Sequence, residues 1–275
     1  MTDDLRVTRD GPVLTVTFDR PAQNNAMTFA MYDGVHSACE TADGDDSVRV
    51  MVLRGAGGRA FVSGTDIVAF RDFSDGADGV VYEERITRVV NRLEDVTVPT
   101  VAAVEGYCLG GGHALAAVCD LRIATESARF GVPIARTLGN CLSMNTVSVL
   151  IAQLGPPRTL DMLLRARLLD AEEAHTAGFV AEVCDDELNA TLEDLLETLL
   201  SHAPLTLWAS KVAVARLRRA ALPGGDDVVA RAFGSEDFHP CRRCLRVRAV
   251  RNLGGGMTDT PYDRPGLIPL SGRPT

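Results

Sequence analysis

The feature that most constrains the fold of this chain is a buried strand followed by consecutive glycines and then by an apolar helix. Residues 100–104 form a short apolar run, glycines stand at 110–112, and residues 113–118 are mostly apolar. The order recurs earlier, where the apolar run 48–53 leads into the Gly-rich segment 55–59. Because strands that alternate with helices build βαβ units, the sequence predicts an α/β fold. Sheets of this type bind ligands where strands end and loops lead into helices.

Other elements follow from periodicity and from turn residues. We expect a hairpin over residues 7–18 around the Gly11-Pro12 turn, a strand over 121–124, a mobile loop over 74–79, and helices over 27–41, 80–95, 142–153, 156–164, 171–177, 186–202 and 205–221. Residues 239–275 are Arg-rich and then Gly- and Pro-rich, so we expect irregular structure there. The abrupt change of composition after Phe238 is what a frameshift would produce, and we treat a frameshift as a hypothesis.

The net charge of the chain bears on which classes of partner it can bind. The net charge is −9, and residues 241–275 carry seven Arg and two Asp, which leaves −14 on the first 240 residues. An acidic body lacks the basic face that nucleic-acid phosphates require, so we expect no nucleic-acid partner. The apolar runs are too short to span a membrane, and the acidic start has no apolar signal segment. We therefore expect a cytoplasmic protein without a membrane partner.

The chain has seven cysteines. In a cytoplasmic protein we interpret most of them as small core residues: Cys39, Cys108, Cys119, Cys141 and Cys184. The remaining pair, Cys241-x-x-Cys244, has the spacing of half a zinc site, but no second pair lies nearby. The sequence therefore predicts no metal site.

Two glycine-containing segments are candidates for chemistry. The run from Gly106 to Leu115 places three glycines between a strand and a helix, and Arg59 to Ile67 follows another strand and turns at Gly64. Glycines let backbone N–H groups approach a ligand, and a helix N-terminus adds unpaired donors and partial positive charge. Two such loops could supply two N–H groups to a developing oxyanion. Close helix–strand packing and a simple turn are the alternatives.

Taken in order, these segments resemble the crotonase (enoyl-CoA hydratase/isomerase) superfamily over roughly residues 5–238. The matching pieces are Asp19-Arg20-Pro21-x-x-x-Asn25-Ala26-Met27, Ala60-Phe61-x-x-Gly64-x-Asp66, Gly106-Tyr107-x-Leu109-Gly110-Gly111-Gly112, Cys119-Asp120-Leu121-Arg122-Ile123-Ala124, Ala128-Arg129-Phe130-Gly131-x-Pro133 and Ala171-Glu172-Glu173-Ala174-x-x-x-Gly178-Phe179-Val180.

The resemblance implies a fold and a ligand. It implies a spiral core of repeated ββα units over residues 1–195, C-terminal helices for trimerisation over 196–238, and a homotrimer or a dimer of trimers. It implies an acyl-CoA substrate with no further cofactor, and a thioester oxygen bound by the backbone N–H groups of Thr65 and Gly111. The substrate-binding positions that it implies are Ala22, Gln23, Ser63, Gly64, Asp66, Ile67, Gly110, Ala114, Ile134 and Arg136.

Two departures bear on the reaction. Hydratases that this chain resembles carry glutamates where it has Ala114 and Ile134. Two carboxylates would activate water and deliver a proton, and neither residue present can do so. His113 is the one candidate base nearby, yet it stands about 100° around the helix from Ala114, so a packing or interface role is favoured. Arg136 could bind an acidic group or lie at the surface or at a trimer interface.

Charged residues near the expected pocket have a plainer interpretation. Glu83 and Glu84 belong to a charge run, and we expect both to be solvated. The function expected is that of an enoyl-CoA hydratase/isomerase family enzyme, a lyase or isomerase, that works through an enolate with a non-standard acid/base group. The alternatives are a non-catalytic acyl-CoA-binding protein or different chemistry on an acyl-CoA. A serine hydrolase is disfavoured because no Gly-x-Ser-x-Gly motif is present.

Overall fold

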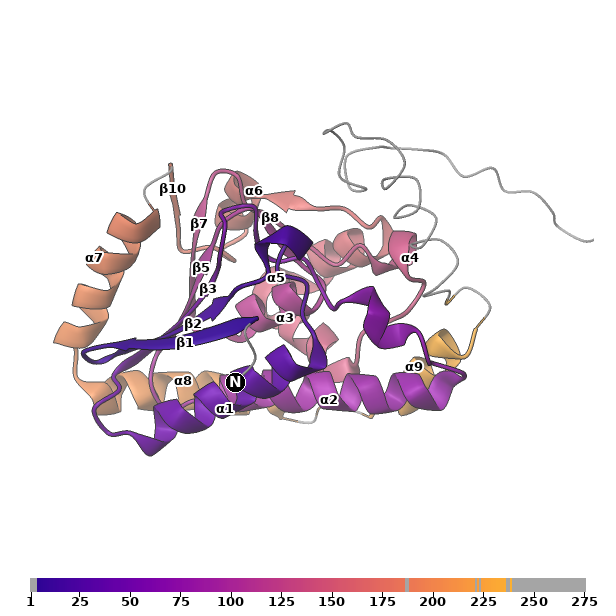
Figure 1. The fold of residues 1–275 in the computed structure, drawn as a ribbon, viewed down its shortest axis with the longest axis horizontal. Helices are drawn as coiled ribbons and strands as arrows, with labels where there is room; N and C mark the ends of the chain where they lie inside the picture. Colours follow the sequence, from indigo (N-terminus) through magenta and orange to yellow (C-terminus); the bar gives the residue numbers. More distant parts are fainter. Residues whose placement is uncertain (1–3, 186–187, 221, 223, 236–237, 239–275) are drawn as a thin grey trace, which may run out of the picture. The chain divides into compact units, whose positions relative to one another are not determined.

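A computed structural model describes residues 4–185, 188–220, 222, 224–235 and 238, all within one compact unit, Met1–Pro240 (Figure 1). The tail 239–275, with Cys241 and Cys244, lies outside the described residues, so the predictions made for it stay predictions. The expected domain boundary at 195/196 falls inside helix α7 (Leu188–Ser201), and the division into domains also stays a prediction.

The larger sheet has six strands in the order β1-β2-β3-β5-β7-β10. Its strands are β1 (Leu5–Asp10), β2 (Val13–Phe18), β3 (Val50–Gly55), β5 (Thr100–Val104), β7 (Leu121–Thr125) and β10 (Glu182–Cys184). Only β1 and β2 pair antiparallel, as the predicted hairpin, and Gly11 between them takes the positive φ of +51° that its turn requires. The strand predicted at 100–104 is confirmed residue for residue.

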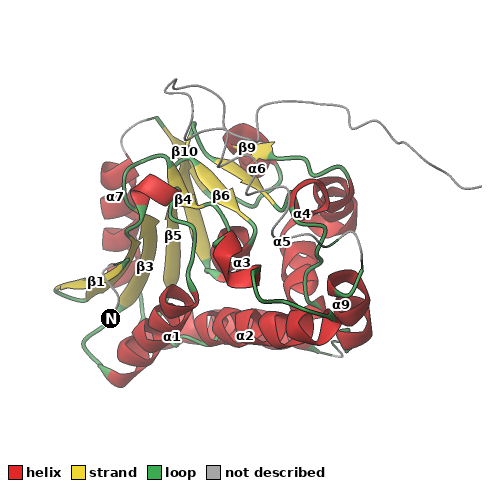
Figure 2. Ribbon diagram, turned by 45° about the vertical axis from the view of Figure 1, so that its right-hand side comes forward, coloured by secondary structure: helices red, strands yellow, loops and turns green. Residues whose placement is uncertain are grey.

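A smaller sheet has the order β4-β6-β8-β9. It contains β4 (Ala60–Val62), β6 (Tyr107–Leu109), β8 (Arg129–Gly131) and β9 (Leu169–Asp170). Three strands of the first sheet are each followed along the chain by a short strand of the second: β3 by β4, β5 by β6 and β7 by β8. Helices follow each pair (Figure 2). The prediction of an α/β fold made of repeated ββα units is therefore confirmed.

The helices around these sheets are α1 (Phe29–Gly44), α2 (Gly76–Glu94), α3 (Gly111–Val118), α4 (Ile134–Thr137), α5 (Met144–Leu164), α6 (Ala171–Thr176), α7, α8 (Pro204–Arg219) and α9 (Asp226–Phe233). Two short 3-10 helices, η1 (Pro21–Gln23) and η2 (Ile67–Phe70), precede α1 and α2. The two helices predicted over 142–153 and 156–164 are the two halves of α5, which bends at Gly155 (φ +73°) before Pro156 and Pro157.

The mobile loop predicted over residues 74–79 is wrong for most of its length, because α2 begins at Gly76. Asp75 and Asp78 form a capping box, in which the side chain of each residue accepts a hydrogen bond from the backbone N–H of the other. Gly79 packs so closely on Phe233 that a Cβ there would lie 2.1 Å from that ring. The Asp and Gly residues that suggested a loop are thus helix-capping and close-packing residues.

The core has two parts. The larger cluster lies among the sheets and helices α1, α2, α3 and α5, and includes Phe18, Phe61, Phe130 and Phe179. The smaller one lies between the other face of β3, β5 and β7 and the helix α7. Cys39, Cys108 and Cys119 are buried in the core as predicted, whereas Cys141 and Cys184 are only partly buried against it.

Helix α8 has no buried residue, although it is 16 residues long. Polar contacts attach it to the core: Lys211 Nζ lies 2.7 Å from an Asp120 carboxylate oxygen, and Arg218 Nε lies 2.7 Å from Glu94 Oε1. Leu205, Val214 and Leu217 on this helix are exposed. Across the described residues, no helix combines the length and apolarity needed to cross a membrane.

Candidate active site

Two loops from the smaller sheet meet at the candidate site. One leaves β4 through Ser63 and Gly64 to Thr65, and the other leaves β6 through Gly110 to Gly111 at the start of α3. Both turn on glycines with positive φ, +114° at Gly64 and +54° at Gly110. A Cβ built on Gly110 would lie only 3.5 Å from the Gly64 Cα, so the two loops are in direct contact. The glycine pattern therefore brings the two predicted segments together.

The backbone N–H groups of Thr65 and Gly111 are unpaired in the described part of the chain. Their neighbours are paired: Asp66 N–H donates to Met27 O at 2.8 Å, and Gly110 N–H donates to Gly131 O at 2.9 Å. Gly111 is the first residue of α3, where an N–H has no partner within the helix. Two unpaired donors on touching loops, one of them at a helix N-terminus, can bind an oxygen that carries negative charge.

Three hydroxyl groups lie beside these donors. Thr65 Oγ1 is 2.8 Å from the Tyr32 hydroxyl and 2.7 Å from the Tyr82 hydroxyl. A Cβ on Gly111 would lie 2.1 Å from the Tyr32 oxygen, so only glycine fits there. Burial raises the pKa of both tyrosines, which keeps them as neutral donors. The three hydroxyls carry three hydrogens for two hydrogen bonds, so one hydrogen is left for another acceptor.

The structure brings part of the predicted substrate-binding set to these loops. Ala22 and Gln23 lie exposed on η1, and the next residue, Asn24, accepts a hydrogen bond from Ser63 N–H at 3.1 Å. Asp66 is the N-cap of η2, where its side chain accepts a hydrogen bond from Val68 N–H, and it pairs with Arg20 at 3.1 Å. The Asp66 carboxylate is thus occupied by structural contacts, while Ile67 beside it is partly buried.

The positions expected around the acyl group are apolar or exposed. Ala114 is buried in α3, and Ile134 at the start of α4 packs partly against the larger core cluster. Arg136 is exposed on α4 and belongs to none of the ion pairs found among the described residues. No carboxylate therefore stands at either position where the resemblance places one.

His113 is fully buried and points into aromatic packing. Its ring stacks on Phe179 with centroids 4.9 Å apart, and neither ring nitrogen has a hydrogen-bond partner among the described residues. Burial, with a smaller contribution from the Arg122 charge, lowers the pKa of His113 to about 3. The imidazole is therefore neutral at ordinary pH, and its contacts favour the packing role over the role of base.

Glu83 contradicts the expectation that it is solvated. It is only 4% exposed, and its Oε2 accepts a hydrogen bond of 2.7 Å from Ser143 N–H. Burial raises the pKa of Glu83 to about 7, although hydrogen bonds from the Ser143 backbone and side chain act in the opposite direction. Glu84, by contrast, is exposed as expected. The missed signal was helical spacing, because Glu83 lies on the buried stripe of α2 with Gly79, Ile86 and Val90.

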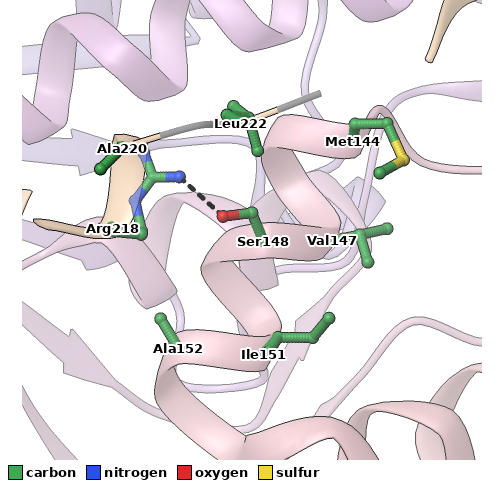
Figure 3. A pocket seen from close by; sticks show the side chains of 8 residues that line it. All are labelled: Met144, Val147, Ser148, Ile151, Ala152, Arg218, Ala220 and Leu222. Atoms are coloured by element: carbon green, nitrogen blue, oxygen red, sulfur yellow. Dashed lines mark hydrogen bonds between the residues drawn. The ribbon is translucent and has the colours of Figure 1, made fainter. Parts of the chain in front are cut away.

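A separate hollow lies between α5 and the end of α8 (Figure 3). Its volume is about 370 Å³, and it is lined by Met144, Val147, Ser148, Ile151, Ala152, Arg218, Ala220 and Leu222. Arg218 donates to Ser148 Oγ at 3.3 Å and also pairs with Glu94, so its charge is already compensated. None of these lining residues belongs to the loops at 63–67 or 110–111. Among the described residues, no group of three or more His, Cys, Asp or Glu side chains is placed to hold a metal ion.

Comparison with known proteins identifies the family. The family model described as enoyl-CoA hydratase/isomerase matches residues 8–236. A 2,3-dehydroadipyl-CoA hydratase of Escherichia coli K12 is 33% identical over 225 residues, which are 81% of this chain and 86% of that protein. A carnitinyl-CoA dehydratase of Salmonella arizonae is 35% identical over 222 residues, covering 77% of this chain and 80% of that one.

The fold is shared as well. A crystal structure of an enoyl-CoA hydratase/carnithine racemase from Magnetospirillum magneticum superimposes with a TM-score of 0.75 and 30% sequence identity, over 91% of this chain and 94% of the other. The match to the family model, over residues 8–236, includes both loops of the candidate site. The chain therefore belongs to the enoyl-CoA hydratase/isomerase family.

Proposed function

We propose that this protein binds an acyl-CoA thioester and stabilises the enolate of its acyl group through the backbone N–H groups of Thr65 and Gly111. The observation that carries the proposal is that these two N–H groups lie on touching loops and have no acceptor among the described residues. When a proton leaves the carbon next to a thioester carbonyl, charge develops on the carbonyl oxygen. Donors that are already in place stabilise that charge without reorganisation.

The class of substrate follows from the family and from the named relatives, which act on 2,3-dehydroadipyl-CoA and carnitinyl-CoA. We expect the CoA portion to pass near Ala22, Gln23, Ser63, Gly64, Asp66 and Ile67, and the thioester to lie beside Gly110. Coenzyme A then enters only as part of the substrate. We also predict that the protein assembles as a homotrimer or a dimer of trimers. We predict that it is cytoplasmic and binds neither nucleic acid nor a membrane.

Hydration by a pair of carboxylates at positions 114 and 134 is not expected, because Ala114 and Ile134 carry no titratable group. The loss of two such groups removes general acid/base catalysis of about 10²–10⁴-fold each. The second candidate function is therefore an acyl-CoA-binding protein without turnover. The absence of a titratable group at Ala114 and Ile134 favours this second function. Such a protein would bind the thioester through the same N–H groups of Thr65 and Gly111.

The test is a turnover assay with 2-enoyl-, 3-enoyl- and acidic acyl-CoA thioesters, read by mass spectrometry beside calorimetric binding of a thioether analogue. The informative variant is Gly111→Pro, which removes one donor at the first position of a helix, where proline is tolerated. Because a Cβ at 111 would collide with the Tyr32 hydroxyl, the variant is made in a Tyr32→Phe background and compared with Tyr32→Phe alone.

We expect the wild type to turn over at least one thioester, and the added proline to lower kcat by about 10²–10³-fold. Binding without any turnover would support the second candidate function instead. If the Tyr32→Phe protein and its proline derivative bind and react equally well, the oxyanion role of Gly111 is wrong.

A further inference from the structure

Glu83 is the one buried carboxyl among the described residues, and it has no cationic partner there. The other carboxyls in the described ranges reach water, and many of them pair with arginines. Burying an unpaired carboxylate costs free energy that an alanine or a leucine on the same helix face would not cost. A group of this kind marks a functional position more often than a structural one.

The position of Glu83 links it to the donor site. The preceding residue, Tyr82, bonds Thr65 Oγ1, and the Glu83 charge contributes to the raised pKa of both Tyr82 and Tyr32. Helix α2, which carries Glu83, packs against α1, α3, α5 and α9. The charged side chains of α9, Asp226, Asp227 and Arg231, are exposed. The carboxyl is thus within electrostatic range of the hydroxyl groups that touch the oxyanion-binding loops.

Ser143 fixes the Glu83 side chain. Its N–H donates to Glu83 Oε2 at 2.7 Å, and its hydroxyl lies 2.9 Å from Thr87 Oγ1 and 3.1 Å from Thr146 Oγ1. Ser143 is also the N-cap of α5, so its own backbone is held by that helix. The carboxyl is therefore held in one place, as an acid/base group must be if it is to face a substrate carbon.

The titratable groups whose pKa is raised by the Glu83 charge are themselves uncharged near neutral pH. They are Tyr32 on α1, Tyr82 on α2 and Cys141 before α5, and burial raises the pKa of each. His113 on α3 is neutral and stacks on Phe179. Only burial and the hydrogen bonds from Ser143 act on the Glu83 carboxyl itself, so its pKa of about 7 reflects its own pocket. A base with such a pKa is half ionised at neutral pH.

We propose that Glu83 supplies the acid/base group that positions 114 and 134 lack, and that it moves one proton between carbons of the bound acyl chain. The inference rests on the proposed function, since the enolate must be stabilised by Thr65 and Gly111. In a 3-enoyl thioester the Glu83 carboxylate takes the C2 proton. The C2–H electron pair passes toward the carbonyl oxygen, and this gives a dienolate.

The second half of the reaction returns the proton. The dienolate electrons form the C2=C3 bond while the former C3=C4 pair takes the proton from Glu83 at C4. The product is the 2-enoyl thioester, Glu83 is again ionised, and neither water nor a redox partner is consumed. Hydration would need water activation and a separate proton delivery, which one carboxyl does not provide simultaneously. The reaction class that fits one buried carboxyl is therefore isomerisation or exchange of the C2 proton.

The test compares Glu83→Gln with Glu84→Gln. Glutamine keeps the size of the side chain and an oxygen that accepts from Ser143 N–H, so a purely structural role survives the change. Glu84 is exposed on the same helix and provides a matched loss of charge. Three quantities are measured for each full-length protein: the Kd of a thioether acyl-CoA analogue, deuterium exchange at C2 of a saturated acyl-CoA in D2O, and isomerisation of a 3-enoyl-CoA.

We expect Glu83→Gln to bind the analogue within about 2-fold of the wild type but to lose exchange and isomerisation by about 10²–10⁴-fold, with Glu84→Gln unchanged. Wild-type kcat/KM should rise with pH through about 7, and the residual rate of Glu83→Gln should lack that rise. Equal exchange rates in the wild type and Glu83→Gln overturn the inference, as does binding without exchange in the wild type. A wild type that fails to bind the analogue refutes the proposed function itself.

Discussion

The hydroxyl of Tyr82 lies 2.7 Å from Oγ1 of Thr65, the residue whose backbone N–H faces no acceptor among the described residues. Tyr32 approaches the same oxygen from α1 at 2.8 Å. Helices α1 and α2 thus hold the loop after β4 through one threonine side chain. The contact ties the position of a backbone donor to two buried aromatic residues that are far from it in the sequence.

Thr65→Val should therefore destabilise the protein more than Tyr32→Phe or Tyr82→Phe. Each tyrosine substitution removes one hydrogen bond and leaves Thr65 Oγ1 with a partner, at a cost of about 0.5–1.5 kcal/mol. Valine removes the Thr65 oxygen that both tyrosine hydroxyls bond. Each buried hydroxyl left without a partner costs about 1–3 kcal/mol of stability. Urea unfolding at fixed protein concentration measures the difference. A valine variant no less stable than the phenylalanine variants would mean that water replaces the Thr65 oxygen.

Glu83→Gln should change how stability depends on pH. The pKa of Glu83 is about 7 in the folded protein and 4.5 as an ordinary carboxyl, so the folded state holds a proton that the unfolded state has released. Wild-type stability should fall as pH rises from about 4.5 to 7, by roughly 2–3 kcal/mol from this group. The variant lacks that contribution. Urea unfolding at half-unit pH steps tests this, and parallel curves for the two proteins would show that the carboxyl does not titrate near 7.

The sequence was a good guide to the elements whose pattern is local. The hairpin at 7–18, the strand at 100–104 and the two glycine loops follow from residues a few positions apart. Glu83 could not be placed in the same way, because its burial depends on α5, some 60 residues later, and on Ser143 at the start of that helix. The start of α2 was missed because Asp and Gly serve loops and helix caps equally well.

His113→Phe should reduce the loss of stability that the protein undergoes as the pH falls below about 6.5. The pKa of His113 is about 3 in the folded protein and about 6.5 when unfolded, so only the unfolded state binds this proton between those values. Wild-type stability is then lost as pH falls below about 6.5, by up to about 1.4 kcal/mol per pH unit from this residue. Phenylalanine keeps the ring stack on Phe179 and removes two unpaired nitrogens. Thermal unfolding from pH 7 to 4 should show the smaller loss in the variant, and equal losses would contradict the burial of a neutral imidazole.

The outer side of α8 should be a contact between copies of the chain. Val214 and Leu217 are 68% and 78% exposed, and they lie three residues apart on one side of a helix that has no buried residue. Covering exposed apolar side chains at such positions with a second chain removes apolar surface from water, which stabilises the association of the two chains. The variant Val214→Glu/Leu217→Glu should therefore lower the molar mass seen by light scattering from that of a trimer or hexamer toward that of a monomer. Val81→Glu is the control, because Val81 is 65% exposed on α2 and loses an apolar group in the same way. Circular dichroism should stay unchanged in both variants, and an unaltered mass in the double variant would place the contact elsewhere.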